Sequence, residues 1–161
     1  MLYQETTRVR SIVGRIESGE DVIDSLTELC REAGVKAGEI RAVGSFESVE
    51  LVRFDGDEGS YVTTFDSAGE FEVVSLNGNV SVLGDEIVLR LDALMTAEGP
   101  AGLQYVSGQL RGGTAQSCEF VLEVFEDLAM ERKLDADTGQ LVLKTIRRTE
   151  DESMSDEAST E

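Results

Sequence analysis

The sequence contains no histidine and no tryptophan, and it has a single proline. Without histidine, the chain cannot build Ser-His or Cys-His catalytic pairs, imidazole metal sites or imidazole acid–base chemistry. No apolar run approaches the ~20 residues that a membrane-spanning helix needs. The chain begins Met1-Leu2-Tyr3-Gln4-Glu5, which lacks the basic and apolar leader of a signal peptide. We therefore expect a soluble, cytoplasmic protein of one domain that does not associate with a membrane.

Cysteine is also scarce: Cys30 and Cys118 stand far apart, each inside an apolar periodic segment. Neither belongs to a C-x-x-C pair of the kind that holds zinc or exchanges disulfides. A disulfide is rare in a cytoplasmic chain of this size, which buries enough apolar surface without one. The two cysteines are predicted to be reduced thiols within the core.

Basic residues are few, 14 against 33 acidic ones, for a formal net charge of −19. Lysine occurs only as Lys36, Lys133 and Lys144, so arginine dominates the basic residues. This balance is typical of proteins from salt-loving cells, where ~1 M salt shortens the screening length to about 3 Å. We expect a halophilic protein, with an ordinary acidic protein as the alternative. Such a charge gives no global attraction to DNA, because DNA binding depends on Lys and Arg replacing phosphate counterions.

One amphipathic helix is predicted near the start of the chain. Ser18 is expected to cap it, with Glu20 and Asp21 in the first turn, where the helix dipole favours acidic side chains. Gly34 is expected to end it. The predicted apolar face consists of Val22, Leu26, Leu29 and Cys30.

The segment from Phe71 to the predicted turn at Gly84-Asp85 contains Asn77-Gly78, a dipeptide that favours a hairpin. The apolar residues at positions 74, 76, 80 and 82 share one face only if a single strand continues through Gly78. We therefore predict one long strand, in which Gly78 marks a close backbone approach or a bulge.

Most of the remaining chain alternates as strands, so the fold class is predicted to be α+β, a mainly antiparallel sheet packed on one long amphipathic helix. Thr96–Pro100 is expected to be a loop, and Leu128–Leu143 a short turn or helix followed by an extended piece. We divide the chain into a domain at 1–145 and a disordered acidic tail at 146–161. Further strands are expected at 8–16, 40–43, 49–54, 61–65, 87–93, 103–110 and 118–125.

Catalytic signatures are missing: no glycine-rich phosphate loop and no zinc-type cysteine spacing occurs. The carboxylates are too numerous to select an acid–base pair, and no lysine stands in a recognisable nucleophile context. We therefore predict that the protein is not an enzyme. Two basic pairs, Arg8 with Arg10 and Arg147 with Arg148, are either solvated or contacts for DNA phosphates.

The segments Gly14–Val22, Ala42–Val49 and Gly69–Val80 contain a helix entry S-G-E-D-V and a strand F-E-x-x-S-L-x-G. Together they resemble the PPC domain, also called the DUF296 family, over roughly Arg8–Phe125. The resemblance implies a compact α+β domain that assembles as a homotrimer. It also implies a connection with DNA, although the Arg-Gly-Arg-Pro hook that plant members carry for this purpose does not occur here.

Prokaryotic members of that family often carry an L-H-x-H strand and a G-G-H-L segment whose histidines hold a metal. The corresponding strand here reads Leu89-Arg90-Leu91-Asp92, and the second segment best fits Gly102-Leu103-Gln104-Tyr105. Arginine cannot ligate a metal and glutamine is a poor zinc ligand, so we predict no metal and no other cofactor. Arg90 and Asp92 are expected to form an ion pair or, with Glu72 and Gln104, a pocket for a small polar ligand.

The sequence therefore leaves two candidate functions. The first is a non-enzymatic DNA-binding or transcription-associated protein that contacts DNA through Arg8 and Arg10. The alternative is a homotrimeric regulatory module that binds a small ligand at the four pocket residues and does not contact DNA.

Overall fold

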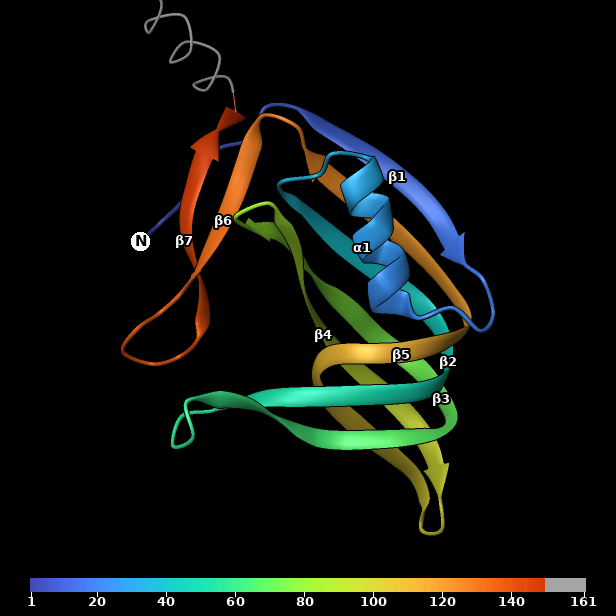
Figure 1. Cartoon of the computed structure of the whole chain (residues 1–161). Helices are drawn as coiled ribbons and strands as arrows, with labels where there is room; N and C mark the ends of the chain where they lie inside the picture. Colours follow the sequence, from blue (N-terminus) through green and yellow to red (C-terminus); the bar gives the residue numbers. More distant parts are fainter. Residues whose placement is uncertain (150–161) are drawn as a thin grey trace, which may run out of the picture.

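The computed structural model describes residues 1–149, which form seven strands and one helix around a single core (Figure 1). No helix among these residues is long and apolar enough to cross a membrane. The elements in chain order are β1 (Val9–Ile16), α1 (Val22–Glu32), β2 (Gly38–Asp55), β3 (Ser60–Leu83), β4 (Glu86–Gly99), β5 (Gly102–Phe125), β6 (Leu128–Leu134) and β7 (Leu141–Arg148).

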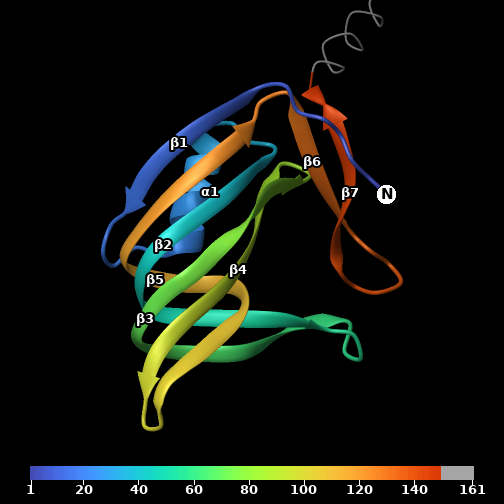
Figure 2. The same cartoon turned by 180° about the vertical axis from the view of Figure 1, so that it is seen from behind.

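The strands form one strongly bent sheet with the order β1-β5-β2-β3-β6-β7, and β4 pairs with both β3 and β5. Strands β2, β3, β4 and β5 therefore make a closed circuit, which leaves no free edge among them. The pairings are antiparallel except for one parallel bridge between Val82 and Glu131. The β2–β3 and β6–β7 hairpins project toward the same side of the molecule, whereas the β4–β5 hairpin projects downward (Figures 1 and 2).

Helix α1 covers one face of the sheet, and the predicted apolar residues Val22, Leu26 and Cys30 are fully buried there. Its end is confirmed, because Gly34 follows the C-cap with φ of +66°. Its start differs from the prediction: the cap is Asp21, whose carboxylate accepts hydrogen bonds from the backbone of the first turn, and not Ser18. The helix is also short, with 11 residues, so the expectation of a long helix was wrong.

Several strands are longer than predicted. The segments expected at 40–43 and 49–54 are one strand, β2, and those at 61–65 and 71–83 belong to β3. Register shifts within the β2–β3 and β2–β5 pairings let these strands bend without ending, and such bulges interrupt the sequence alternation that marks a strand. The segment Thr96–Pro100 is not a loop, because β4 pairs with β5 as far as Gly99. Residues 128–143 form most of a hairpin, β6–β7, with no helix.

The passage of β3 through Gly78 is confirmed. Gly78 pairs with Ile40 of β2 on one side and with Leu91 of β4 on the other. A Cβ atom at this position would stand 1.8 Å from the carbonyl oxygen of Arg90, so only glycine allows the strands to approach this closely.

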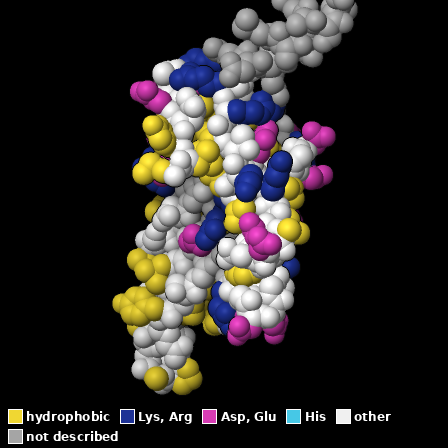
Figure 3. Space-filling model, turned by 90° about the vertical axis from the view of Figure 1, so that its left-hand side faces the viewer, with side chains coloured by type: hydrophobic (Ala, Val, Ile, Leu, Met, Phe, Trp, Pro, Cys, Tyr) yellow, Lys and Arg dark blue, Asp and Glu magenta, His cyan; other side chains and the backbone are white. Residues whose placement is uncertain are grey.

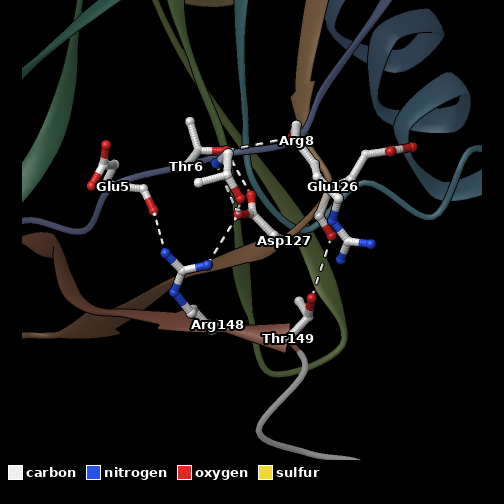
Figure 4. A network of polar contacts seen from close by, with 8 residues as sticks. Glu5, Thr6, Arg8, Glu126, Asp127, Arg148 and Thr149 are labelled. Atoms are coloured by element: carbon white, nitrogen blue, oxygen red, sulfur yellow. Dashed lines mark hydrogen bonds and ion pairs between the residues drawn. The ribbon is translucent and has the colours of Figure 1, made fainter.

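The start of the chain is fastened to the β6–β7 hairpin by Asp127, which is 1% exposed (Figure 4). Its carboxylate accepts hydrogen bonds from the Thr6 hydroxyl at 2.6 Å and from the backbone and hydroxyl of Thr7 at 2.9 Å. These bonds hold its pKa far below the usual value. The guanidinium of Arg148 lies 3.3 Å away at the end of β7. Residues 146–148 therefore belong to a strand, and the rest of the predicted tail, from 150 to 161, lies outside the described residues.

Candidate functional site

A cleft of about 260 Å³ lies where the central strands meet α1 and the β6–β7 hairpin. Three arginines contribute to it, together with one amide side chain and an otherwise largely apolar wall. Among residues 1–149, no carboxylate belongs to the lining, although the chain has more than twice as many acidic as basic residues. The lining residues are Ile23, Val52, Tyr61, Val88, Leu89, Arg90, Gln109, Leu110, Arg111, Arg132 and Leu141.

Arg132 is the innermost cation of the cleft, with only 5% of the residue exposed. Its guanidinium donates to the Ser81 hydroxyl at 2.8 Å, to the Asn79 side-chain oxygen at 2.8 Å and to the Leu141 carbonyl at 3.2 Å. All three acceptors are neutral. Burial lowers the pKa of Arg132 from its ordinary value, and the nearby charge of Arg90 lowers it further. The buried positive charge of Arg132 is therefore stabilised by the dipoles of a hydroxyl, a side-chain amide and a backbone carbonyl.

Arg90 and Arg111 are the outer cations of the cleft, and their side chains are 49% and 56% exposed. Arg90 Nε lies 3.9 Å from Asp92, and Arg111 Nη1 lies 3.8 Å from Glu50. Both distances exceed the 2.7–2.9 Å of a charge-assisted hydrogen bond, so neither guanidinium is bonded to its carboxylate. In Figure 3, Lys and Arg side chains gather in the middle of the face shown, beside a few acidic ones.

The four residues predicted as a ligand pocket do not lie together within one chain. Arg90 and Asp92 are neighbours along β4, but Gln104 pairs with Ala97 and Glu72 pairs with Thr96, both further along the same strand. The residue opposite Asp92 on β5 is Gln109. Gln104 is five residues from Gln109 along an extended strand, a separation of about 17 Å.

Within one chain, the strand register therefore places Gln109, and not the predicted Gln104, beside Asp92. The segment Ser107-Gly108-Gln109-Leu110 also matches G-G-H-L at its second and fourth positions, and it places glutamine directly across from Asp92. Knowledge of the strand register could have identified Gln109 from the sequence. When two residues of a site lie on one strand, a third residue on the neighbouring strand must lie directly across from them. Arg132 carried no such signal: it reaches the cleft from β6, more than 40 residues further along the chain than Arg90.

The residues at these positions do not fit a metal ion. Arg90 is a permanent cation, Gln109 offers a weak amide ligand, and Asp92 alone supplies a carboxylate. Among residues 1–149, no cluster of three or more cysteine, aspartate or glutamate side chains is arranged to hold one.

Arginines of both basic pairs considered for DNA form ion pairs with carboxylates, and Arg148 pairs with Asp127 at 3.3 Å. Arg10 Nε bonds Glu126 at 2.8 Å, and Arg147 Nε bonds Glu131 at 2.8 Å. The backbone carbonyl of Arg8 accepts a hydrogen bond from the backbone N–H of Glu126, at the position shown in Figure 4. The paired carboxylates weaken the attraction of Arg10 and Arg147 for a phosphate backbone.

Both cysteines are fully buried free thiols, as predicted. Burial raises the pKa of Cys30 and of Cys118 to about 11. A nucleophilic cysteine requires the thiolate, so neither side chain is prepared for covalent chemistry.

Fold and cleft together define a small bent-sheet domain with one covering helix and a cationic recess. This chain belongs to the Plants and Prokaryotes Conserved (PCC) domain family, whose model matches residues 3–126. The comparison with curated proteins finds no match.

Solved structures share the fold at low sequence identity. A metal-containing protein from Archaeoglobus fulgidus is 23% identical with a TM-score of 0.78, over 90% of this chain and 99% of that one. A plant- and prokaryote-conserved (PPC) protein from Pyrococcus horikoshii is 21% identical with a TM-score of 0.79, over 90% and 98%. A protein from Bacteroides thetaiotaomicron, named as a candidate DNA-binding protein, is 20% identical with a TM-score of 0.76, over 83% and 91%.

Proposed function

We propose that this protein is a non-enzymatic module that binds a small polar ligand in the cleft between Arg90, Gln109 and Arg132. The observation that carries the proposal is the buried guanidinium of Arg132 within a recess that excludes carboxylates. Concave sites with an apolar wall and a few convergent polar groups are the usual form of a small-molecule site. The proposal retains Arg90 from the predicted pocket, places Asp92 at its rim, and replaces Gln104 by Gln109.

A thermal-shift screen of neutral, cationic and anionic metabolites tests this proposal. At least one compound should raise the melting temperature of the wild type, and Gln109→Ala should reduce that shift. Gln109 is suited to this test because it is partly exposed and uncharged, so its truncation preserves the fold. A screen without any hit, or hits that Gln109→Ala leaves unchanged, would overturn the assignment.

DNA binding is the second candidate, and the name given to the Bacteroides relative favours it. The charge distribution opposes it, because the chain carries −19 overall and Arg10 is neutralised by Glu126. Fluorescence anisotropy of labelled genomic fragments in a salt series separates the two candidates. Binding that weakens with salt and is reduced by replacing both Arg8 and Arg10 with glutamine would establish DNA as the partner.

We further propose that the module is a homotrimer, as the family resemblance implies. Large apolar side chains remain exposed on the sheet and on the β4–β5 hairpin, and such surfaces usually mark contacts between proteins. Light scattering on the full chain should give a mass near three times 17.5 kDa, and a monomeric mass would contradict the proposal. The exposed residues include Val13, Val43, Val74, Leu94, Leu103 and Tyr105.

A further inference from the structure

We propose that the ligand of this cleft is an oxyanion, a carboxylate or phosphate group carried by a small, partly apolar metabolite. This inference rests on the proposed function and specifies the chemical class of the ligand. Arg132 supplies a buried charge at the base of the cleft, and Arg90 and Arg111 supply exposed charges at its mouth.

The first support is the local reversal of charge. The chain has 33 acidic residues against 14 basic ones, yet the described part of the chain lines the cleft with three arginines and no carboxylate. Arg90 and Arg132 line the same cleft, and the repulsion between their like charges lowers the pKa of Arg132 in addition to the effect of burial. An anion between the guanidiniums turns that repulsion into two attractions.

The second support is the unused bonding capacity of Arg132. A guanidinium has five N–H donors, and three contacts to neutral groups account for three of them. No carboxylate among residues 1–149 lies within ion-pair distance of it. A cation this deeply buried is costly unless it is paired, so the site is suited to receive a negative partner.

The third support is the long distance between each arginine at the mouth of the cleft and its nearest carboxylate. Elsewhere on the chain, Arg10 and Arg53 bond their carboxylates at 2.8 and 2.7 Å. Arg90 and Arg111 stay at 3.9 and 3.8 Å from theirs, so no hydrogen bond to a carboxylate must break before either closes on a ligand. Planar guanidiniums match the oxygen pairs of carboxylates and phosphates, which favours bidentate contact.

The apolar wall of the cleft restricts the kind of molecule that can carry the oxyanion. Val52, Leu89, Leu110 and Tyr61 line the same recess, so part of the ligand is apolar or carries a ring. A volume of about 260 Å³ accommodates a small metabolite but not an oligonucleotide.

Isothermal titration with phenyl phosphate, benzoate, inorganic phosphate and benzyl alcohol tests the inference at constant ionic strength. We expect phenyl phosphate or benzoate to bind the wild type and benzyl alcohol, which lacks the charge, to bind far more weakly. The stronger of the two probes identifies the phosphoryl or the carboxylate source, and binding of inorganic phosphate alone identifies the free ion.

Arg111→Gln provides the decisive variant, because its exposed side chain contributes little to folding. Loss of one charge-assisted contact should weaken the best probe about tenfold to a hundredfold. Arg15→Gln is the matched control, since Arg15 is 58% exposed on another strand and pairs with Glu17. It should leave the affinity unchanged.

Two outcomes of the titration overturn the inference. One is an affinity for the charged probes no greater than that for benzyl alcohol. The other is a loss of affinity that is equal in Arg111→Gln and Arg15→Gln, which would reflect net charge alone. A neutral metabolite that binds the wild type and is lost in Gln109→Ala would overturn the oxyanion assignment while the ligand-binding function stands.

Discussion

Replacement of Asp21 by alanine is expected to destabilise the protein at the junction of helix and sheet. One oxygen of this carboxylate accepts hydrogen bonds from the backbone of Ile23 at 2.8 Å and of Asp24 at 3.0 Å. The other accepts from the backbone of Gly113 in β5 at 2.9 Å. A single side chain therefore caps α1 and satisfies a strand N–H at the same time.

The expected magnitude follows from these two roles. Loss of an N-cap costs about 1 kcal/mol. Gly113 is buried, so its N–H is left without a partner, at a cost of about 1–3 kcal/mol. The free energy of unfolding should fall by about 2–4 kcal/mol, which corresponds to a melting temperature lower by about 4–16 °C in a chain of this size.

Urea denaturation followed by circular dichroism measures this loss, at fixed salt and fixed protein concentration because the proposed assembly would make stability depend on both. Asp21→Ser separates the two roles, because serine retains the cap but does not reach β5 as a second oxygen does. The free energy of unfolding of Asp21→Ser should be about 1 kcal/mol higher than that of Asp21→Ala. Ser18→Ala is the control, since the structure assigns this exposed residue no part in the cap.

The opposite ranking would refute the reasoning. If Ser18→Ala destabilised the protein by about 1 kcal/mol while Asp21→Ala stayed within about 0.5 kcal/mol of the wild type, the cap would be the one suggested by the sequence. Equal losses in Asp21→Ala and Asp21→Ser would show that the contact with Gly113, and not the cap, supplies the stabilisation.

Further predictions concern the strands, the N-terminal anchor, the thiols and the surface. Gly78→Ala should prevent recovery of folded soluble protein, whereas Gly84→Ala, at φ +61° in open space, should cost about 1–2 kcal/mol in urea. The depressed pKa of Asp127 contributes stability that is complete above its unfolded value of about 3.9 and is lost as pH falls. Asp127→Asn should therefore lower the melting temperature at neutral pH and flatten its decline in acid. Cys30 and Cys118 should react with a thiol reagent at pH 8 only after unfolding, because their pKa is about 11. The melting temperature of the wild type should rise with KCl if its acidic surface is adapted to salt.

Local sequence patterns correctly predicted the structural features that depend on residues close together in the chain. The buried face of α1 follows from helical periodicity, and the end at Gly34 follows from the freedom of glycine at positive φ. The continuity of β3 through Gly78 follows from the parity of its apolar residues. The helix start at Asp21 was missed, because Ser18 and Asp21 are both good caps and only the contact with β5 distinguishes them.

The pairings between strands that are distant in the sequence could not be predicted from local sequence patterns. Thr96–Pro100 reads as a loop because glycine and proline end it, yet its first residues are held as strand by β5. Motif spacing predicted Gln104 beside Arg90 and Asp92, whereas the strand register puts Gln109 across from Asp92. The third arginine of the cleft comes from β6, which joins the sheet through one parallel bridge that no periodicity reveals.

Arg90 and Asp92 of β4 have an electrostatic effect that differs from that of the two histidines which the family resemblance implies at these positions. An imidazole pair is neutral and attracts a cation, whereas Arg90 brings a permanent positive charge to the same strand. Arg132 adds a second charge that bulk salt screens poorly because it is buried. Surface carboxylates repel an approaching anion at long range, but in concentrated salt that repulsion ends within about 3 Å of the surface. A recess that selects oxyanions is therefore compatible with a chain of net charge −19, because the buried charge of Arg132 still attracts an anion where the surface carboxylates are screened.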